Sequence, residues 1–181
     1  ARFRATALRE GGENASYSRE FAFSKSTGRP AVLNTKPNDS YTFEGASLLV
    51  DGYHSRPVFT SGAWLGYLDE PLDVTIDMGG EQSYRSVELE TLAEKGDWIF
   101  PPSSVTVWVS DNGTDFTEVA SVSVPEAKAG DADGIGRYRM QFPETSARYL
   151  KVVAQNAAAI PAWHPGAGSK GFLFVDEVVV E

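Results

Sequence analysis

Hydrophobic and polar residues alternate along most of this chain with a period of two, which is typical of strands. In LDVTIDMG, residues 72–79, polar positions separate four apolar ones: Leu72, Val74, Ile76 and Met78. In SSVTVWVSDNGTDFTEV, residues 103–119, three valines alternate before an Asp-Asn-Gly turn signal. We expect the first stretch to form a half-buried strand and the second to form a hairpin.

Four further segments carry the same signal, separated by clusters of Gly, Pro, Asp and Asn. They are YRSVELETL at 84–92, RYRMQF at 137–142, RYLKVVAQ at 148–155 and GFLFVDEVVV at 171–180. No segment keeps a helical period for three turns, although GASLLVDG at 45–52 is predicted to make about one turn. The sequence therefore predicts an all-β fold, with short strands at the spacing of a sandwich.

The last predicted strand carries two adjacent carboxylates, Asp176 and Glu177. Strict alternation would point them to opposite faces, so one of them would enter an apolar row whichever face is the core. An ionised carboxylate is tolerated there only with hydrogen bonds, a cation or access to water. We therefore expect a partner that compensates for this charge.

Length and charge narrow the classes of partner. The chain has 181 residues, enough for one domain with a substantial core. Its 16 Lys and Arg against 25 Asp and Glu give a net charge of −9, which opposes binding to nucleic acid or anionic membranes. No apolar run approaches the roughly 20 residues that span a bilayer. We predict no nucleic-acid partner and no membrane insertion, and the absence of cysteine excludes disulfides.

The first 17 residues differ from the rest. RFRATALREGG alternates like a strand that ends in a glycine turn, and the polar stretch GGENASYS follows as a boundary signal. Two interpretations stay open: residues 1–17 are the terminal strand of a preceding module, or they add an N-terminal strand to the same sandwich. In the first case the main domain is 18–181.

Motifs for catalysis are absent from the sequence. The two histidines lack metal-ligand spacing, and there is no G-x-S-x-G nucleophile elbow. The G-x-G-x-x-G match at 166–171 lacks the preceding strand and following helix of a dinucleotide site, so its glycines are predicted to allow a close approach between loop and strand. GDADGIG at 130–136 lacks the closing Glu of a calcium loop and is interpreted as a solvated acidic turn. A carboxylate pair hidden among the acids remains the sequence-level alternative in favour of an enzyme.

The tryptophans divide into two kinds. Trp64 precedes an alternating strand and is predicted to pack in the core. Trp98, in KGDWIFPPSS, and Trp163, in IPAWHPG, lie in loops stiffened by proline. A rigid loop can present an indole for stacking on a sugar ring without having to order it on binding. The alternative is that each indole clasps its own loop onto the end of the sandwich.

A set of motifs in a particular order carries a family resemblance. The motifs are LLVDG at 48–52, AWLGY at 63–67, VTIDMGG at 74–80, WIFPPSSVTVWVSDNGTDF at 98–116, ARYLKVVAQN at 147–156 and PAWHPGAGSKGFLFVDEVVV at 161–180. Over about residues 20–181 this pattern resembles the discoidin-like domains, which include coagulation factor C-type domains and family 32 carbohydrate-binding modules. More narrowly it is similar to the C-terminal module of Bacteroides-type family 20 β-N-acetylhexosaminidases, or chitobiases.

The resemblance implies a discoidin-like β-sandwich jelly roll with ligand-binding loops at one end. It implies a noncatalytic, extracytoplasmic module, periplasmic or at the cell surface, attached to the catalytic domain of a glycoside hydrolase, with an immunoglobulin-like segment before it. The expected partner is a glycan that contains galactose or N-acetylhexosamine. We expect Trp98 and Trp163 to stack on sugar, and His54, Arg56 and His164 to hydrogen-bond to hydroxyl groups. The alternative is a structural module that stabilises the catalytic domain without binding sugar.

The resemblance also implies a structural calcium ion. Its ligands would map to Asp51, the 53–61 loop with Thr60, and Glu177, and the cation would offset the burial of Glu177. The loop YHSRPVFTSGAW departs from the usual spacing of the family, which puts Thr60 and the ion in question. Without calcium, we expect Glu177 to pair with an arginine such as Arg56 or to accept hydrogen bonds from loop amides.

Overall fold

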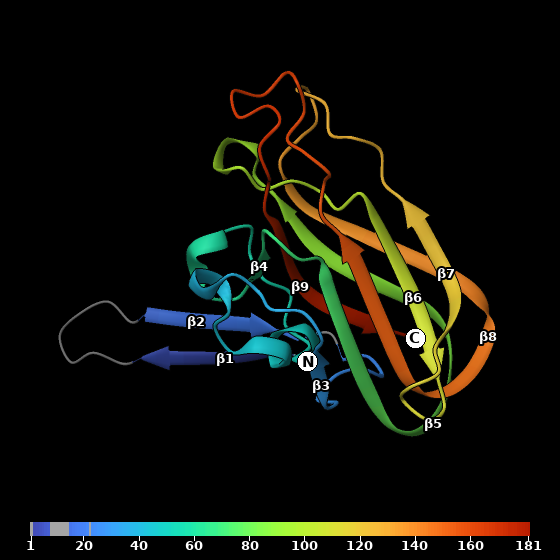
Figure 1. Cartoon of the computed structure of the whole chain (residues 1–181). Helices are drawn as coiled ribbons and strands as arrows, with labels where there is room; N and C mark the ends of the chain where they lie inside the picture. Colours follow the sequence, from blue (N-terminus) through green and yellow to red (C-terminus); the bar gives the residue numbers. More distant parts are fainter. Residues whose placement is uncertain (1, 8–14, 22) are drawn as a thin grey trace.

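Two long antiparallel strands organise the molecule (Figure 1). In the computed structural model, β5 (Leu72–Ala93) pairs with β8 (Gly134–Gln155) along most of its length. Register shifts between Asp77 and Gln82, and between Tyr84 and Ser86, interrupt the ladder where both strands bend. Each strand therefore contributes one half to each layer of a sandwich, whereas the sequence pattern predicts two separate strands in each of these stretches.

The remaining strands complete the two layers. One layer contains β3 (Ala31–Leu33), β6 (Ser104–Ser110) and β7 (Thr117–Ser123), together with the first half of β5 and the second half of β8. The other contains β4 (Leu65–Tyr67) and β9 (Leu173–Val180) with the remaining halves. The strand order is β4-β9-β5-β8-β6-β7, and β3 pairs with β5. The predicted all-β sandwich and the hairpin of 103–119 are confirmed.

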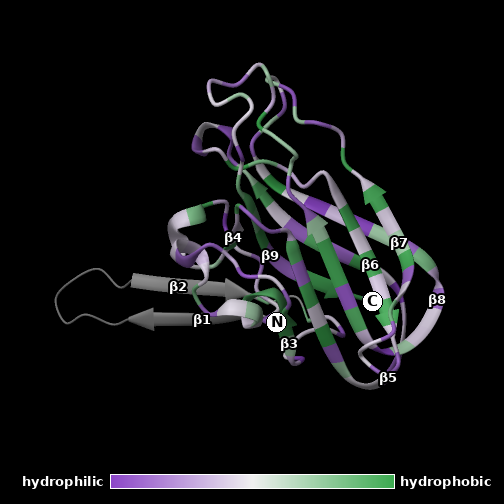
Figure 2. Cartoon of the chain, in the orientation of Figure 1, coloured by the Kyte–Doolittle hydropathy of each residue, from purple (hydrophilic) through white to green (hydrophobic). Residues whose placement is uncertain are grey.

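The core is built from the alternating positions of these strands, seen in Figure 2 as green bands along β5 and β6. The four apolar side chains predicted for 72–79 are fully buried, and so is Trp64. Short 3₁₀ helices form η1 (Asp39–Tyr41), η2 (Gly45–Val50), η3 (Phe59–Ser61) and η4 (Lys95–Asp97). The predicted single turn in 45–52 is η2, and it adds Leu49 to the core.

The structure describes residues 2–7, 15–21 and 23–181, and the side chains of 21 and 23–181. Within that part, β1 (Arg2–Ala7) and β2 (Ala15–Glu20) pair with each other in a two-stranded sheet that projects to one side (Figure 1). Strand β2 runs across the predicted boundary at residue 17, and a preceding module stays a prediction. Within the same ranges no helix is long and apolar enough to cross a membrane.

Loops gather at one end of the sandwich, at the top of Figure 1. They are 94–103, 124–133 and 156–172, and we call this the loop end. The bends of β5 and β8 lie at the opposite end. A fourth loop, 51–61, is hydrogen-bonded to β9. The loop end forms one region, and loop 51–61 together with β9 forms a second. These two regions contain all the site residues that the sequence predicts.

Candidate functional site

Trp98 lies directly after η4, in a left-handed backbone conformation with φ of 64°. A bulky side chain seldom adopts this conformation, which costs on the order of 1 kcal/mol or more. Hydrogen bonds hold the residue there: its N–H donates to the Lys95 carbonyl (3.0 Å), and its carbonyl accepts from the Phe172 N–H (2.8 Å). The backbone is thus fixed, while 41% of the side chain remains exposed.

Gly166 gives the Trp98 indole its place. A Cβ atom at residue 166 would lie 2.8 Å from the indole ring, so a larger residue there would displace it. Gly171 is similarly close to the Phe100 side chain, at 2.7 Å. The glycines do allow a close approach, but their partners are the rings of Trp98 and Phe100 in loop 94–103 rather than the following strand that the sequence predicts.

Trp163 is held by the proline-flanked loop and by one polar contact. Its Nε1 donates a hydrogen bond to the carbonyl of Ala127 (2.9 Å), which ties two of the loops together. Its ring lies 6.4 Å from that of Phe100, and 39% of the side chain is exposed. One part of the indole is therefore packed, and the rest faces solvent.

His164 is buried between the two tryptophans, with 8% exposed. Its Nδ1 accepts from the Gly166 N–H (3.0 Å), so the ring hydrogen is on Nε2, which donates to the Lys95 carbonyl (2.9 Å). Its ring meets those of Trp98 and Trp163 edge-on, with the ring centroids 5.9 and 5.6 Å apart, respectively. Both nitrogens are thus occupied within the protein, and the expected hydrogen bond from His164 to a hydroxyl group does not fit this geometry.

We call Trp98, Trp163 and His164 the aromatic platform. Next to it lies an apolar groove of about 450 Å³, lined by residues 100–103, 124–127 and 157–162. Phe100 belongs to both features, because its ring also contacts His164 edge-on at 5.5 Å. The loop end thus combines two partly exposed indoles with an adjacent apolar groove.

The second region contains the two carboxylates of β9. Leu89 of β5 is paired with Val178 of β9, and Thr91 is paired with Val175. Two residues further along β5 therefore correspond to three residues along β9. The extra residue is a bulge, and it shifts the alternation so that Val175 and Val178 both face the core. The carboxylates lie within this bulge, so the strict alternation expected from the sequence is wrong here.

Loop 51–61 provides donors to both carboxylates. Glu177 Oε2 accepts from the Gly52 N–H (3.1 Å), and Asp176 Oδ2 accepts from the Ser55 N–H (2.7 Å). Both side chains are almost fully buried, and burial raises the pKa of Asp176 to about 8 and that of Glu177 to about 9. The expected capping of loop amides by Glu177 is present, and no ion pair joins Glu177 to Arg56 among the described residues.

The calcium ligand set fits this region in part. Glu177 Oε1 is buried without a hydrogen-bond partner among the described side chains, as a cation ligand would be. The nearby Asp51 carboxylate contributes to the raised pKa of Glu177, and a cation would relieve that repulsion. Thr60 is exposed, and no group of three or more His, Asp or Glu in the described ranges is arranged to hold a metal.

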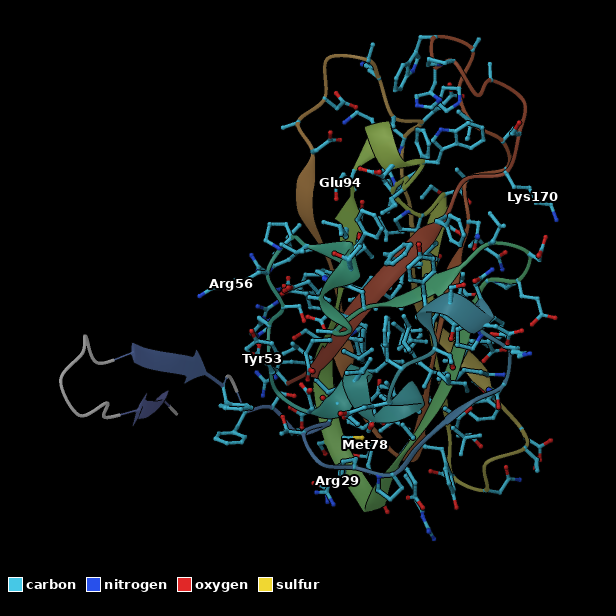
Figure 3. All side chains as sticks on the ribbon, turned by 90° about the vertical axis from the view of Figure 1, so that its left-hand side faces the viewer. Arg29, Tyr53, Arg56, Met78, Glu94 and Lys170 are labelled. Carbon is cyan, nitrogen blue, oxygen red and sulfur yellow. The ribbon has the colours of Figure 1, made fainter. Side chains whose placement is uncertain are left out.

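His54 and Arg56 are not brought to the aromatic platform. His54 Nδ1 donates to Glu90 Oε2 (2.9 Å), which also accepts from Arg137 Nε (2.9 Å), and the bond to Glu90 raises the pKa of His54. Arg56 is exposed and points away from the body of the sandwich (Figure 3). Sequence reasoning missed Glu90, because a buried acid on an alternating strand carries no signal that it faces a histidine.

Comparisons with known proteins agree with this architecture. The F5/8 type C domain family matches residues 33–170, so this chain belongs to that family, and the predicted discoidin-like fold is confirmed. No curated protein sequence matches it.

Several solved structures share the fold at low sequence identity. The Clostridium perfringens module CpGH89CBM32-5, in complex with GalNAc-β-1,3-galactose, has a TM-score of 0.54 and 16% identity, covering 83% of this chain and 93% of that one. Chitosan-binding module 2 of the Paenibacillus sp. IK-5 chitosanase/glucanase, in complex with chitotriose, has 0.55 and 17%, covering 87% and 98%. A Streptococcus pneumoniae fucose-binding module has 0.53 and 22%, covering 88% and 94%.

Proposed function

We propose that this chain is a noncatalytic carbohydrate-binding module whose ligand stacks on the aromatic platform. The observation that carries the proposal is the joint exposure of Trp98 and Trp163 at the same end, with one buried histidine in edge contact with both. An exposed indole face gains free energy from contact with the apolar face of a sugar. The similar modules that hold sugars in their structures support this assignment.

The finer parts of the proposal concern the glycan and the attached enzyme. We infer a ligand that contains galactose or N-acetylhexosamine, and a parent glycoside hydrolase of the β-N-acetylhexosaminidase type, outside the cytoplasm. A single shallow site is expected to bind weakly, on the order of millimolar, so that attachment to the enzyme adds avidity. The module alone should not hydrolyse aryl N-acetylglucosaminides, and turnover abolished by changing one of its carboxylates would contradict this.

A titration with chitotriose and with GalNAc-β-1,3-galactose tests the binding site. Trp98→Gly removes the indole and also suits the positive φ at this position, so the fold should remain intact. We expect at least a fivefold loss of affinity for whichever sugar the wild-type chain binds. Phe23→Ala is the matched control, because Phe23 is an exposed ring that lies outside the loop end. Equal affinity of the Trp98→Gly variant and the wild type would refute the platform as the site.

The apolar groove favours the alternative function, in which the loop end packs on the catalytic domain. Proline and alanine dominate its lining, and such a surface is typical of a protein contact. Ala159→Arg places a charge in the groove without touching the indoles. The alternative predicts a loss of thermal stability in the catalytic domain of the full protein, with no change in sugar binding by the module.

A further inference from the structure

Lys95 is buried at the loop end, with 7% of the residue exposed. Its ammonium group is paired with the carboxylate of Asp133 and donates to the carbonyl of Asp131 (2.8 Å). The backbone N–H of Lys95 also donates to Asp133 Oδ1 (3.2 Å). The acidic turn 130–136 therefore holds Lys95 by both its side chain and its backbone.

The carbonyl of Lys95 in turn accepts from both sides of the aromatic platform. It receives the N–H of Trp98 (3.0 Å) and the Nε2–H of His164 (2.9 Å). His164 also contacts Trp163 edge-on, so a shift of this single carbonyl would move both indoles. No other residue in the described part of the chain is hydrogen-bonded to the acidic turn, Trp98 and His164 together.

We propose that Lys95 and Asp133 are a positioning pair that fixes the relative placement of the two indoles for the glycan. This inference rests on the proposed function, and neither side chain is proposed to touch the sugar. The ammonium group of this pair is buried and hydrogen-bonded, and such a contact favours one arrangement of the groups around it. Holding that arrangement before binding reduces the ordering cost of a weak ligand.

The pair also explains the turn GDADGIG, which the sequence presents only as a solvated loop. Asp133 keeps about half of its side chain exposed (48%), yet its hydrogen bond with Lys95 lowers its pKa. The turn thus provides an anchor for the platform from a loop that precedes Trp163 by about thirty residues. The anchor and the indoles lie in different loops, which alternation patterns do not connect.

Fluorine NMR on protein labelled with 5-fluorotryptophan tests the proposal without any sugar. The chain has four tryptophans, and Trp64 and Trp108 report on the body of the sandwich. In Lys95→Met and in Asp133→Asn, we expect the Trp98 and Trp163 signals to shift and broaden while the other two stay unchanged. Lys170→Met is the matched control, since it removes the same ammonium group from loop 156–172 but breaks only an exposed pair with Asp69.

Two variants of the pair, Lys95→Met and Asp133→Asn, are measured so that the failure of one to fold does not prevent a conclusion. If Lys95→Met fails to fold, Asp133→Asn still tests the proposal. In that variant the ammonium group of Lys95 keeps its hydrogen bond to the carbonyl of Asp131, so the fold should be preserved. Unchanged Trp98 and Trp163 signals in Asp133→Asn, or equal changes at all four tryptophans, would overturn the proposal. Affinity for chitotriose is then measured, with a fivefold to tenfold loss expected. If the wild type binds no sugar, the proposed function fails, while the NMR result still decides whether the pair positions the indoles.

Discussion

The loop end and the region of loop 51–61 both bury polar side chains, but they satisfy them differently. At the loop end, His164 uses both ring nitrogens, and Lys95 is paired with Asp133 and bonded to a carbonyl. Beside loop 51–61, Glu90 and Glu177 each keep one buried oxygen without a hydrogen-bond partner among the described residues. The polar groups under the aromatic platform are thus compensated and those beside loop 51–61 only in part, although Asn156 Oδ1, at the start of loop 156–172, also lacks a hydrogen-bond partner among the described residues.

This difference separates two kinds of site. A satisfied network under exposed indoles would give the rigid surface that the proposed stacking of a sugar requires. Buried carboxylates with free lone pairs favour protonation or the binding of a cation. Whether they are protonated or bound to a cation therefore depends on the pH and on the ions in solution.

The largest effect is expected from pH, through Asp176 and Glu177. Their pKa values in the folded chain are about 8 and about 9, well above the value of about 4 that such groups have in an unfolded chain. Between about pH 4 and these folded values, the folded state therefore binds more protons than the unfolded state. The unfolding free energy should therefore fall as pH rises from about 4 towards 9, by on the order of several kcal/mol. Urea unfolding at pH 5, 7 and 9 in a chelating buffer measures it.

The matched control for this titration is the double variant Asp176→Asn, Glu177→Gln. It keeps oxygen acceptors for the amides of Ser55 and Gly52 but cannot ionise. Its stability should depend far less on pH over the same range. A wild-type profile as flat as that of the variant would contradict the prediction.

His164→Ala should cost about 3 kcal/mol of unfolding free energy, because it leaves a cavity and removes the acceptor of the Gly166 N–H. His54→Ala, in the other region, should cost less, since Glu90 keeps its hydrogen bond with Arg137. Chemical unfolding of both variants gives the comparison. Equal losses would show that the two histidines are equally structural.

Calcium should act on one region only. At a tenfold excess over its dissociation constant, an ion bound only to the folded state adds about 1.4 kcal/mol of stability. Thermal melts at neutral pH, with calcium and with chelator, measure the difference, which Glu177→Gln should remove. A wild-type melting temperature that does not change with calcium would contradict the site. It would mean that protonation and the hydrogen bond from the Gly52 amide are enough to compensate for the burial of Glu177.

Trp163→Ala should give the smallest change in stability and a clear change in binding. Because 39% of the side chain is exposed, its loss should leave the melting temperature nearly unchanged. Binding of the sugar should weaken by roughly 1 kcal/mol, about fivefold. A large melting loss with unaltered sugar binding would instead support the interpretation that Trp163 only clasps its loop.

Local alternation was enough to predict the sandwich, because each strand half buries one face whatever its neighbours are. It could not predict that β5 and β8 continue through their bends, or that the bulge in β9 moves Asp176 and Glu177 out of strict alternation. The two exposed tryptophans were predictable from their proline-rich loops. The role of His164 was not, because its Nε2 bonds to a carbonyl 69 residues away in the sequence.

The bends of β5 and β8 make the sandwich a single sheet folded over on itself, with the crease at one end (Figure 1). The loop end is then the open margin, where the two halves are held together by contacts between loops rather than by continuous strands. Hydrogen bonds from Phe100 to Phe172, and from Phe172 to Trp98, close that margin. A sugar that spans both indoles would therefore also act as a mechanical clasp, and the module should resist pulling forces better with its ligand bound.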